Sequence, residues 1–179
     1  MFRWVQRFTP LLIDAARPCR HAVGDRWFVD ETYVKVSGVW RYVYRAIDQH
    51  GRVIDVFVSE HRDIASARTF VATSVLARRI PTEVIADRAA ALANVIEDLI
   101  PAAFHDAGQF ENDRCEAGQG RLKARLRPVR GLKTDRGASV VIRGRAFVQN
   151  VRRGHYEFGV EASPVFRLAA AFDELQLAI

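Results

Sequence analysis

An aspartate in the middle of an apolar, β-branched run is the feature that most constrains this chain. Asp30 lies within residues 27–36, where tryptophan, phenylalanine, valine, threonine and tyrosine predict a strand bound for the core. A carboxylate in such a strand loses its hydration and therefore requires a hydrogen-bonding partner, a proton or a metal ion. Asp30 is thus either a satisfied structural acid or part of a functional site.

The spacing of turns and apolar residues predicts a mixed α/β chain. Strands are expected at 27–36, 40–48 and 53–59, and their short connections favour an antiparallel meander. The elements expected after them are a helix from an Asp63 cap to about residue 79, a strand at 84–86, a helix at 89–99, a short strand near 102–105, helices at 112–126 and 138–153, and an amphipathic helix within 166–177. Before them, a helix is expected to stop at Pro10.

This order of elements matches a ribonuclease-H-like α/β fold. Its mixed sheet has three antiparallel strands followed by parallel strands, and helices flank the sheet. The fourth strand of that arrangement lies beside the first and parallel to it. Asp30, in strand one, and Asp87, at the end of strand four, are therefore expected to be neighbours.

A third acid, Glu116, falls on a predicted helix at the start of a basic segment. Alone, Asp87 would serve as a helix N-cap and Glu116 would be solvated. Taken with Asp30 they form a candidate site for Mg²⁺, which prefers carboxylate oxygens. Two such ions can activate a water or a 3′-hydroxyl and stabilise the leaving oxygen of a phosphodiester. The acids that compete for this role are Glu31, Asp48 and Asp55, and Glu31 is expected to point to the opposite face from Asp30.

Positive charge is concentrated in one part of the chain. Residues 121–156 hold eleven lysines and arginines and a single acid, Asp135, whereas the whole chain carries a net charge of +6. This polarised distribution indicates a polyanionic partner. A solvated basic face is the alternative.

Composition sets the broad class of protein. With 179 residues, 49% hydrophobic and 27% charged, the chain is expected to form one globular domain with short appendages. No apolar run approaches the ~18 residues of a membrane span, and the start lacks signal-peptide features, so a cytoplasmic, nucleoid-associated location without membrane contact is expected. Cys19 and Cys115 are expected to be reduced thiols.

Several segments together resemble the DDE transposases of bacterial insertion sequences, specifically the "insertion sequence six" family. They include Arg-Trp-Phe-Val-Asp-Glu-Thr-Tyr-Val-Lys-Val around Asp30, Tyr-Val-Tyr-Arg-Ala-Ile-Asp at 42–48, Asp-Arg-Ala at 87–89, Arg-Pro-Val-Arg-Gly-Leu-Lys at 127–133, and Phe-Val-Gln-Asn-Val-Arg-Arg-Gly-His at 147–155. The similarity extends over residues 3–160 and the combined pattern is highly specific.

The resemblance implies a catalytic triad of Asp30, Asp87 and Glu116, which would also hold two Mg²⁺ ions, with Mn²⁺ able to substitute. It implies DNA as partner, both transposon ends and target, and a homo-oligomer in the active state. Lys123 would lie two helical turns beyond Glu116 on the same face. The DNA-contacting residues expected with it are Arg121, Arg125, Arg127, Arg130 and Lys133.

The chain also departs from the family pattern. Family members carry an upstream helix-turn-helix, of which residues 3–8 resemble the last turn, and Gly118-Gln119 replaces Asp-His after the third acid. The expected division is a remnant of the DNA-binding region and linker at 1–24, the DDE catalytic domain at 25–158 and a tail at 159–179. Two functions stay open: metal-dependent DNA cleavage and strand transfer, or a truncated, impaired DNA-binding remnant that regulates a full-length transposase. A free-standing ribonuclease-H-like nuclease is a third and weaker reading.

Overall fold

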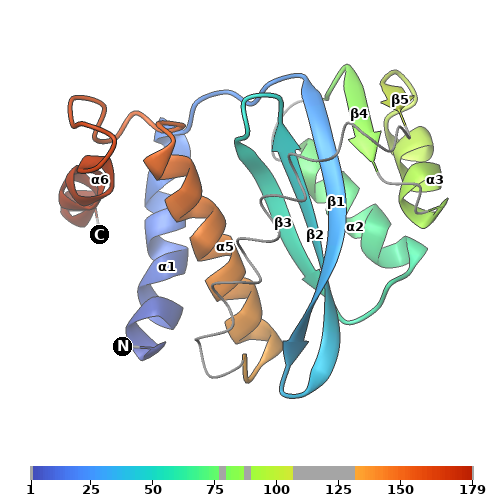
Figure 1. Cartoon of the computed structure of the whole chain (residues 1–179), viewed down its shortest axis with the longest axis horizontal. Coiled ribbons are helices and arrows are strands. Elements are labelled where there is room, and N and C mark those ends of the chain that lie inside the picture. Colours follow the sequence, from blue (N-terminus) through green and yellow to red (C-terminus); the bar gives the residue numbers. More distant parts are fainter. Residues whose placement is uncertain (1, 77–79, 87–89, 107–131, 179) are drawn as a thin grey trace. The chain divides into compact units, whose positions relative to one another are not determined.

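The computed structural model describes residues 2–76, 80–86, 90–106 and 132–178 (Figure 1). It divides into two compact units. One unit combines Met1–Ala22 with Arg136–Ile179, and the other is Val23–Asp135. The predicted helix at 112–126 and residues 77–79 of the predicted helix after Asp63 lie outside the described residues.

A mixed five-stranded sheet forms the frame of the unit Val23–Asp135 (Figure 1). Its strands are β1 (Arg26–Val36), β2 (Val39–Asp48), β3 (Val53–Ser59), β4 (Glu83–Ala86) and β5 (Phe104–Asp106), in the spatial order β3-β2-β1-β4-β5. The first three strands pair antiparallel, and β4 pairs parallel with both β1 and β5. This confirms the predicted ribonuclease-H-like sheet, with the fourth strand beside the first.

A tight turn sets the register of the central hairpin. Ser37 and Gly38 both have positive φ, at 50° and 84°, as the two central residues of a two-residue hairpin require. Val36 therefore pairs with Val39, and counting back along both strands places Asp30 directly opposite Arg45. A slip of one residue would move Asp30 to the other face of the sheet, so this turn helps to fix the geometry of the site.

Helices α2 (Ile64–Leu76) and α3 (Ala90–Leu99) cover one face of this sheet. The Asp63 carboxylate accepts the Ser66 backbone N–H at 2.8 Å and so caps α2, as predicted. Beneath the helices lies a core that includes Trp27, Tyr44 and Phe70, each at most 2% exposed. The Tyr44 and Phe70 rings stack with centroids 5.7 Å apart, and burial raises the pKa of Tyr44 to about 12.

The other unit is helical. It contains α1 (Phe2–Ala16), a 3-10 turn (Arg17–Cys19), α5 (Asp135–Arg152, of which all but the first residue belongs to this unit), α6 (Arg167–Leu175) and a 3-10 turn (Gln176–Ala178). Aromatic and aliphatic side chains pack around Phe147, whose ring meets Tyr156 at 5.4 Å and Phe172 at 6.4 Å. The helices predicted at 138–153 and within 166–177 are therefore confirmed.

The prediction that the first helix stops at Pro10 is wrong, because α1 continues to Ala16. Proline removes one helical hydrogen bond and disfavours the preceding turn. Here the Pro10 ring is exposed, while Leu12 and Ile13 beyond it join the apolar cluster around Phe147. Burial of the apolar stripe beyond Pro10 offsets the local cost of the proline.

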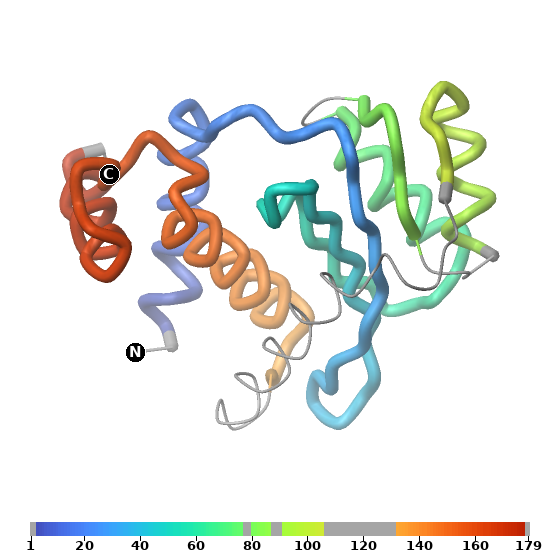
Figure 2. Tube along the Cα trace, turned by 45° about the horizontal axis from the view of Figure 1, so that its top comes forward, coloured from blue at the N-terminus to red at the C-terminus, as the bar shows by residue number. Residues whose placement is uncertain are grey.

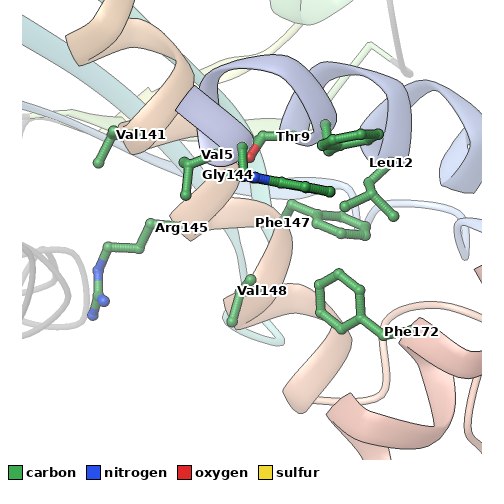
Figure 3. A pocket seen from close by; sticks show the side chains of 11 residues that line it. Val5, Thr9, Leu12, Val141, Gly144, Arg145, Phe147, Val148 and Phe172 are labelled. Carbon is green, nitrogen blue, oxygen red and sulfur yellow. The ribbon is translucent and has the colours of Figure 1, made fainter. Parts of the chain in front are cut away.

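Gly144 allows α5 to approach α1 closely (Figure 3). A Cβ built on Gly144 would lie 2.6 Å from the Thr9 methyl carbon, which is shorter than real carbon contacts. We expect Gly144→Ala to lower the free energy of unfolding, because this overpacking outweighs the gain of about 1 kcal/mol in helix propensity.

A double-mutant cycle measured by urea unfolding tests that prediction. In a Thr9→Ala background the clash is gone, so Gly144→Ala should become stabilising by up to about 1 kcal/mol. If Gly144→Ala has the same effect in both backgrounds, the close approach of Thr9 and Gly144 does not govern this position.

Candidate active site around Asp30

Asp30 lies on β1 at the point where pairing with β4 ends. The last parallel pair joins Val29 to Ala86, and Asp30 is the next residue along β1. The residue is 8% exposed, and its Oδ1 accepts the backbone N–H of Glu31 at 2.6 Å. A largely desolvated carboxylate is thus held at the end of a parallel strand pair, beside the point where β4 stops.

The other members of the predicted triad, Asp87 and Glu116, lie outside the described residues. Asp87 directly follows Ala86, the last residue of β4. The predicted DNA-contacting residues that also lie outside the described residues are Arg121, Lys123, Arg125, Arg127 and Arg130. Lys133 is described and its side chain is exposed.

Two competing acids, Glu31 and Asp55, point to the other face of the sheet. Glu31 pairs with Tyr44, whose ring lies in the core under α2, and its Oε1 is 2.8 Å from the Arg62 Nε. Asp55 pairs with Ala46 of the same core. The prediction that Glu31 and Asp30 face opposite ways is confirmed, and neither competitor shares a face with Asp30.

Asp48, the third competitor, is a structural acid. It is fully buried, and its two carboxylate oxygens accept backbone N–H groups of Gly24, His50 and Arg52 at 2.9–3.0 Å. The guanidinium of Arg52 lies 3.9 Å from Oδ2. With these donors arranged around it, the Asp48 carboxylate organises the β2–β3 turn and is not available to a substrate.

Arg45 is a neighbour of Asp30 that the sequence did not reveal. It is directly opposite Asp30 on the adjacent strand and only 5% exposed. Residues directly opposite in an antiparallel pair share a face, and opposite charges there stabilise each other. The signal that could have found it is the Ser-Gly pair at 37 and 38: the predicted strands at 27–36 and 40–48 left the register open, and the two-residue turn seen in the structure sets Asp30 opposite Arg45.

The residues around Asp30 suit a hard cation only in part within the described ranges. Asp30 supplies one carboxylate, the ligand type that Mg²⁺ prefers. Across residues 2–76, 80–86, 90–106 and 132–178, no three His, Cys, Asp or Glu side chains gather as ligands of one ion. The donor chemistry of Asp30 fits a metal site, which would need further ligands beyond those that the described residues bring together.

A bidentate ion pair joins β2 to the first residue of α5. Arg41 donates from Nε to Asp135 Oδ1 at 2.7 Å and from Nη2 to Oδ2 at 3.0 Å. This geometry is the strongest form of carboxylate recognition by arginine. The hydrogen bond from Arg41 holds the pKa of Asp135 below its usual value, and the same pair raises the pKa of Arg41.

The Arg41–Asp135 pair predicts a pH-dependent contribution to stability. Because the folded-state pKa of Asp135 is below its unfolded value of about 3.9, the contribution is present above that value and is lost as pH falls through the folded pKa. Asp135→Asn should therefore destabilise the protein near neutral pH, and its difference from wild type should shrink toward about pH 3.

Urea unfolding at both pH values measures this effect. Asp14→Asn, which removes an ion pair whose side chains are both about 65% exposed, is the control and should change little. A difference between Asp135→Asn and wild type that stays constant with pH contradicts the assignment.

The helical unit contains an apolar groove of about 490 Å³ (Figure 3). Trp4 and Phe8 of α1 stack with ring centroids 4.8 Å apart and line the groove, as do Phe147 and Phe172. Among the described residues that line it, there is no carboxylate, histidine or cysteine. These lining residues offer no group for acid–base or metal chemistry, and Asp30 remains the candidate catalytic position.

The structure is similar to retroviral integrase cores, which defines its class as ribonuclease-H-like. The catalytic core domain of HTLV-2 integrase in complex with magnesium, in its trimeric form, matches with a TM-score of 0.53 at 16% identity, covering 85% of this chain and 99% of that one. The simian T-cell lymphotropic virus intasome in complex with the PP2A regulatory subunit B56 gamma also matches with a TM-score of 0.53, at 15% identity, covering 74% of this chain and 50% of that one. At such identities the likeness establishes the fold.

Sequence comparison then gives the family. The model of a DDE domain family matches residues 24–155. The transposase for the insertion sequence-like element IS431mec of Staphylococcus aureus is 30% identical over 139 residues, covering 75% of this chain and 62% of that protein. The transposase for insertion sequence element IS257 in transposon Tn4003, also from Staphylococcus aureus, matches to the same extent. The chain belongs to the DDE-domain transposases of the "insertion sequence six" family.

This chain spans about three fifths of the length of those two relatives. Among the described helices, none combines the length and the apolar character required to cross a membrane.

Proposed function

We propose that this chain is a transposase catalytic domain that cleaves DNA at an element end and joins the freed 3′-hydroxyl to target DNA, with Asp30, Asp87 and Glu116 as its metal-binding acids. One observation carries the proposal: Val29 pairs with Ala86, and each is followed by an acid. Paired strands lie about 4.8 Å apart, so the residues that directly precede Asp30 and Asp87 in the chain are neighbours, and this supports a site shared by the two acids.

The metal requirement follows from the acids and the phosphodiester chemistry. Two Mg²⁺ ions held by Asp30, Asp87 and Glu116 would activate the attacking hydroxyl and stabilise the leaving oxygen, and Mn²⁺ would substitute. Because Asp30 is buried, little water competes with a metal ion for its carboxylate. The positive charge of Arg45, directly opposite on β2, would help to hold that carboxylate in position. The HTLV-2 integrase core, which shares the fold, was solved with magnesium, which supports the choice of metal.

DNA is the proposed partner. The basic segment 121–156 would bind phosphates next to the acids, through Arg121, Lys123, Arg125, Arg127, Arg130 and Lys133. Because one catalytic site must meet both an element end and a target, we propose that the active form is a homo-oligomer. In this proposal residues 25–158 are the catalytic domain, and 1–24 and 159–179 are appendages.

A strand-transfer assay tests the proposal. The purified chain is incubated with a pre-nicked element end, a supercoiled target plasmid and Mg²⁺ or Mn²⁺, and covalent joining is scored on a denaturing gel. Joined product that disappears with EDTA is expected. If the wild-type chain binds the end DNA but joins none of it with either metal, the chain is a DNA-binding remnant and not an active recombinase.

A further inference from the structure

The outer half of the β1–β2 hairpin carries exposed aromatic and cationic side chains. β1 pairs with β4 only up to Val29. Beyond that point, β1 and β2 continue as a hairpin past the rest of the sheet (Figure 2). Helices α2 and α3 pack on one face of the sheet. On the part of that face that belongs to the outer hairpin, Tyr33 is 52% exposed and Trp40 is 49% exposed. Tyr44, on the same face but under α2, is 1% exposed. The helices thus leave this part of the face open.

Tyr33, Lys35 and Trp40 form one cluster, which we call the hairpin platform. Lys35 and Trp40 are directly opposite each other, and the Lys35 Nζ lies 4.8 Å from the centroid of the Trp40 ring. The Tyr33 ring meets the Trp40 ring at 89° with centroids 5.0 Å apart. The cross-strand register therefore holds two flat rings and an ammonium group side by side at the surface.

Exposed cationic residues lie near the hairpin platform. Positions 31, 33 and 35 share one face of β1 at intervals of about 6.6 Å. The Glu31 carboxylate is paired at 2.8 Å with Arg62, whose side chain is 59% exposed. At the turn, the Ser37 hydroxyl donates to the carbonyl of Lys133, which brings a second exposed lysine next to the hairpin. Lys35 thus lies at the Trp40 ring itself, while the paired Arg62 lies further along the strand and Lys133 lies next to the turn.

Hairpin stability alone does not account for this arrangement. Cross-strand aromatic pairs and the cation–π contact stabilise the hairpin, yet about half of the Tyr33 and Trp40 side chains stays exposed and available to a ligand. Exposed rings between cations are the pattern of proteins that bind single-stranded nucleic acid, where bases stack on the rings and phosphates meet the cations. In a duplex the base faces are covered by stacking, so the rings favour unpaired nucleotides.

We infer that the hairpin platform binds unpaired nucleotides of a DNA strand, at a site separate from the catalytic acids. The platform lies on the opposite face of the sheet from Asp30, because Tyr33 and Lys35 have odd positions on β1 and Asp30 an even one. This inference rests on the proposed function in taking DNA as the partner. It adds a contact surface for the DNA that flanks the reacting end.

Binding of a fluorescently labelled, mixed-sequence single strand, followed by anisotropy, tests the inference. Tyr33→Leu and Trp40→Leu keep apolar bulk for the hairpin but remove the flat ring, and each should weaken binding by about 5- to 150-fold. Tyr33→Phe should bind like wild type. Lys35→Gln should lower the salt dependence, reducing the slope of log K against log salt by about 0.7.

Phe104→Ala is the matched control, since it removes a 68% exposed ring from β5 of the same sheet, and it should leave binding unchanged. The inference is overturned if both leucine variants bind the single strand like wild type. It is also overturned if Phe104→Ala weakens binding as much as the leucine variants do. The same holds if the leucine variants lower the affinity for a fully paired duplex as much as the affinity for the single strand.

The inference and the proposed function fail separately. Asp30→Asn should abolish strand transfer and leave single-strand binding intact, whereas the leucine variants should weaken binding and leave the metal requirement unchanged. Loss of single-strand affinity in the leucine variants of a chain that never joins DNA supports the platform and contradicts the proposed function. A wild-type chain that joins DNA but binds no single strand contradicts the platform alone.

Discussion

Replacing Asp30 with asparagine is expected to lower strand transfer by more than about 100-fold, because even residues that only support a metal ligand change affinity or activity by 10–100-fold. Asparagine has nearly the shape of aspartate. It keeps an oxygen that can accept the Glu31 N–H, which lies 2.6 Å from Asp30 Oδ1 in the wild-type chain. What it loses is the negative charge that a divalent cation requires.

The same variant should fold normally. Asp30 is 8% exposed and lies opposite the buried Arg45, so removing its charge should lower the free energy of unfolding by about 1–3 kcal/mol, less than the total of about 5–15 kcal/mol of a typical domain. Strand transfer on a denaturing gel and urea unfolding give the two readouts. Asp87→Asn should behave in the same way.

Asp25→Asn provides the matched control, because Asp25 is an exposed acid five positions away from Asp30. The Asp25→Asn variant should retain full activity. An Asp30→Asn chain that joins DNA at the wild-type rate contradicts the assignment of Asp30 as a metal ligand. A chain that loses both activity and folding would instead mark Asp30 as a structural acid.

Replacing Asp48 with alanine is expected to produce the largest loss of stability, about 3–5 kcal/mol. The substitution leaves three backbone N–H groups without their acceptor, at a fully buried position. It also leaves the guanidinium of Arg52, a residue only 7% exposed, without the carboxylate 3.9 Å away. The total free energy of unfolding of a typical domain is only about 5–15 kcal/mol, so this loss removes a large part of it.

Urea unfolding with a matched series separates the causes of this loss. Asp48→Asn keeps one oxygen acceptor and should lose less than Asp48→Ala. Asp25→Ala removes an exposed carboxylate that accepts one side-chain hydrogen bond, and should stay within about 0.5 kcal/mol of wild type. Equal losses for Asp48→Ala and Asp25→Ala would show that the buried hydrogen bonds do not dominate.

Asp30 and Asp48 show how far local sequence can distinguish a candidate metal-binding acid from a structural acid. Asp30 and Asp48 both occur in apolar, strand-forming segments, and both were candidates for the site. Asp48 is distinguished by the three N–H donors that the β2–β3 turn and Gly24 bring to it. Those donors come from separate parts of the chain, so only the folded structure shows that its carboxylate is fully used.

Pro10 illustrates the opposite kind of limit. Local propensity predicts a helix end there, since proline lacks an N–H and crowds the preceding turn. The helix continues because Leu12 and Ile13 bury apolar surface against residues more than 130 positions away, including Phe147. A long-range gain of this kind is absent from any local window of sequence.

The sequence by itself indicated the strands of the central hairpin. Alternating apolar runs predicted them and Ser37 and Gly38 marked the turn, whereas the start of β2 at Val39, and with it the position of Asp30 opposite Arg45, came from the structure. These features are local, because strand periodicity and turn geometry depend on residues only a few positions apart.

Only the tertiary structure decided which side chains stay exposed. Tyr33, Trp40 and Tyr44 all belong to aromatic, strand-forming segments and share one face, yet Tyr44 is buried beneath α2 and the other two are half exposed. The difference depends on where a helix more than twenty residues further along the chain comes to rest on the sheet. Burial is a property of that packing, and packing is set by the summed contacts of distant segments.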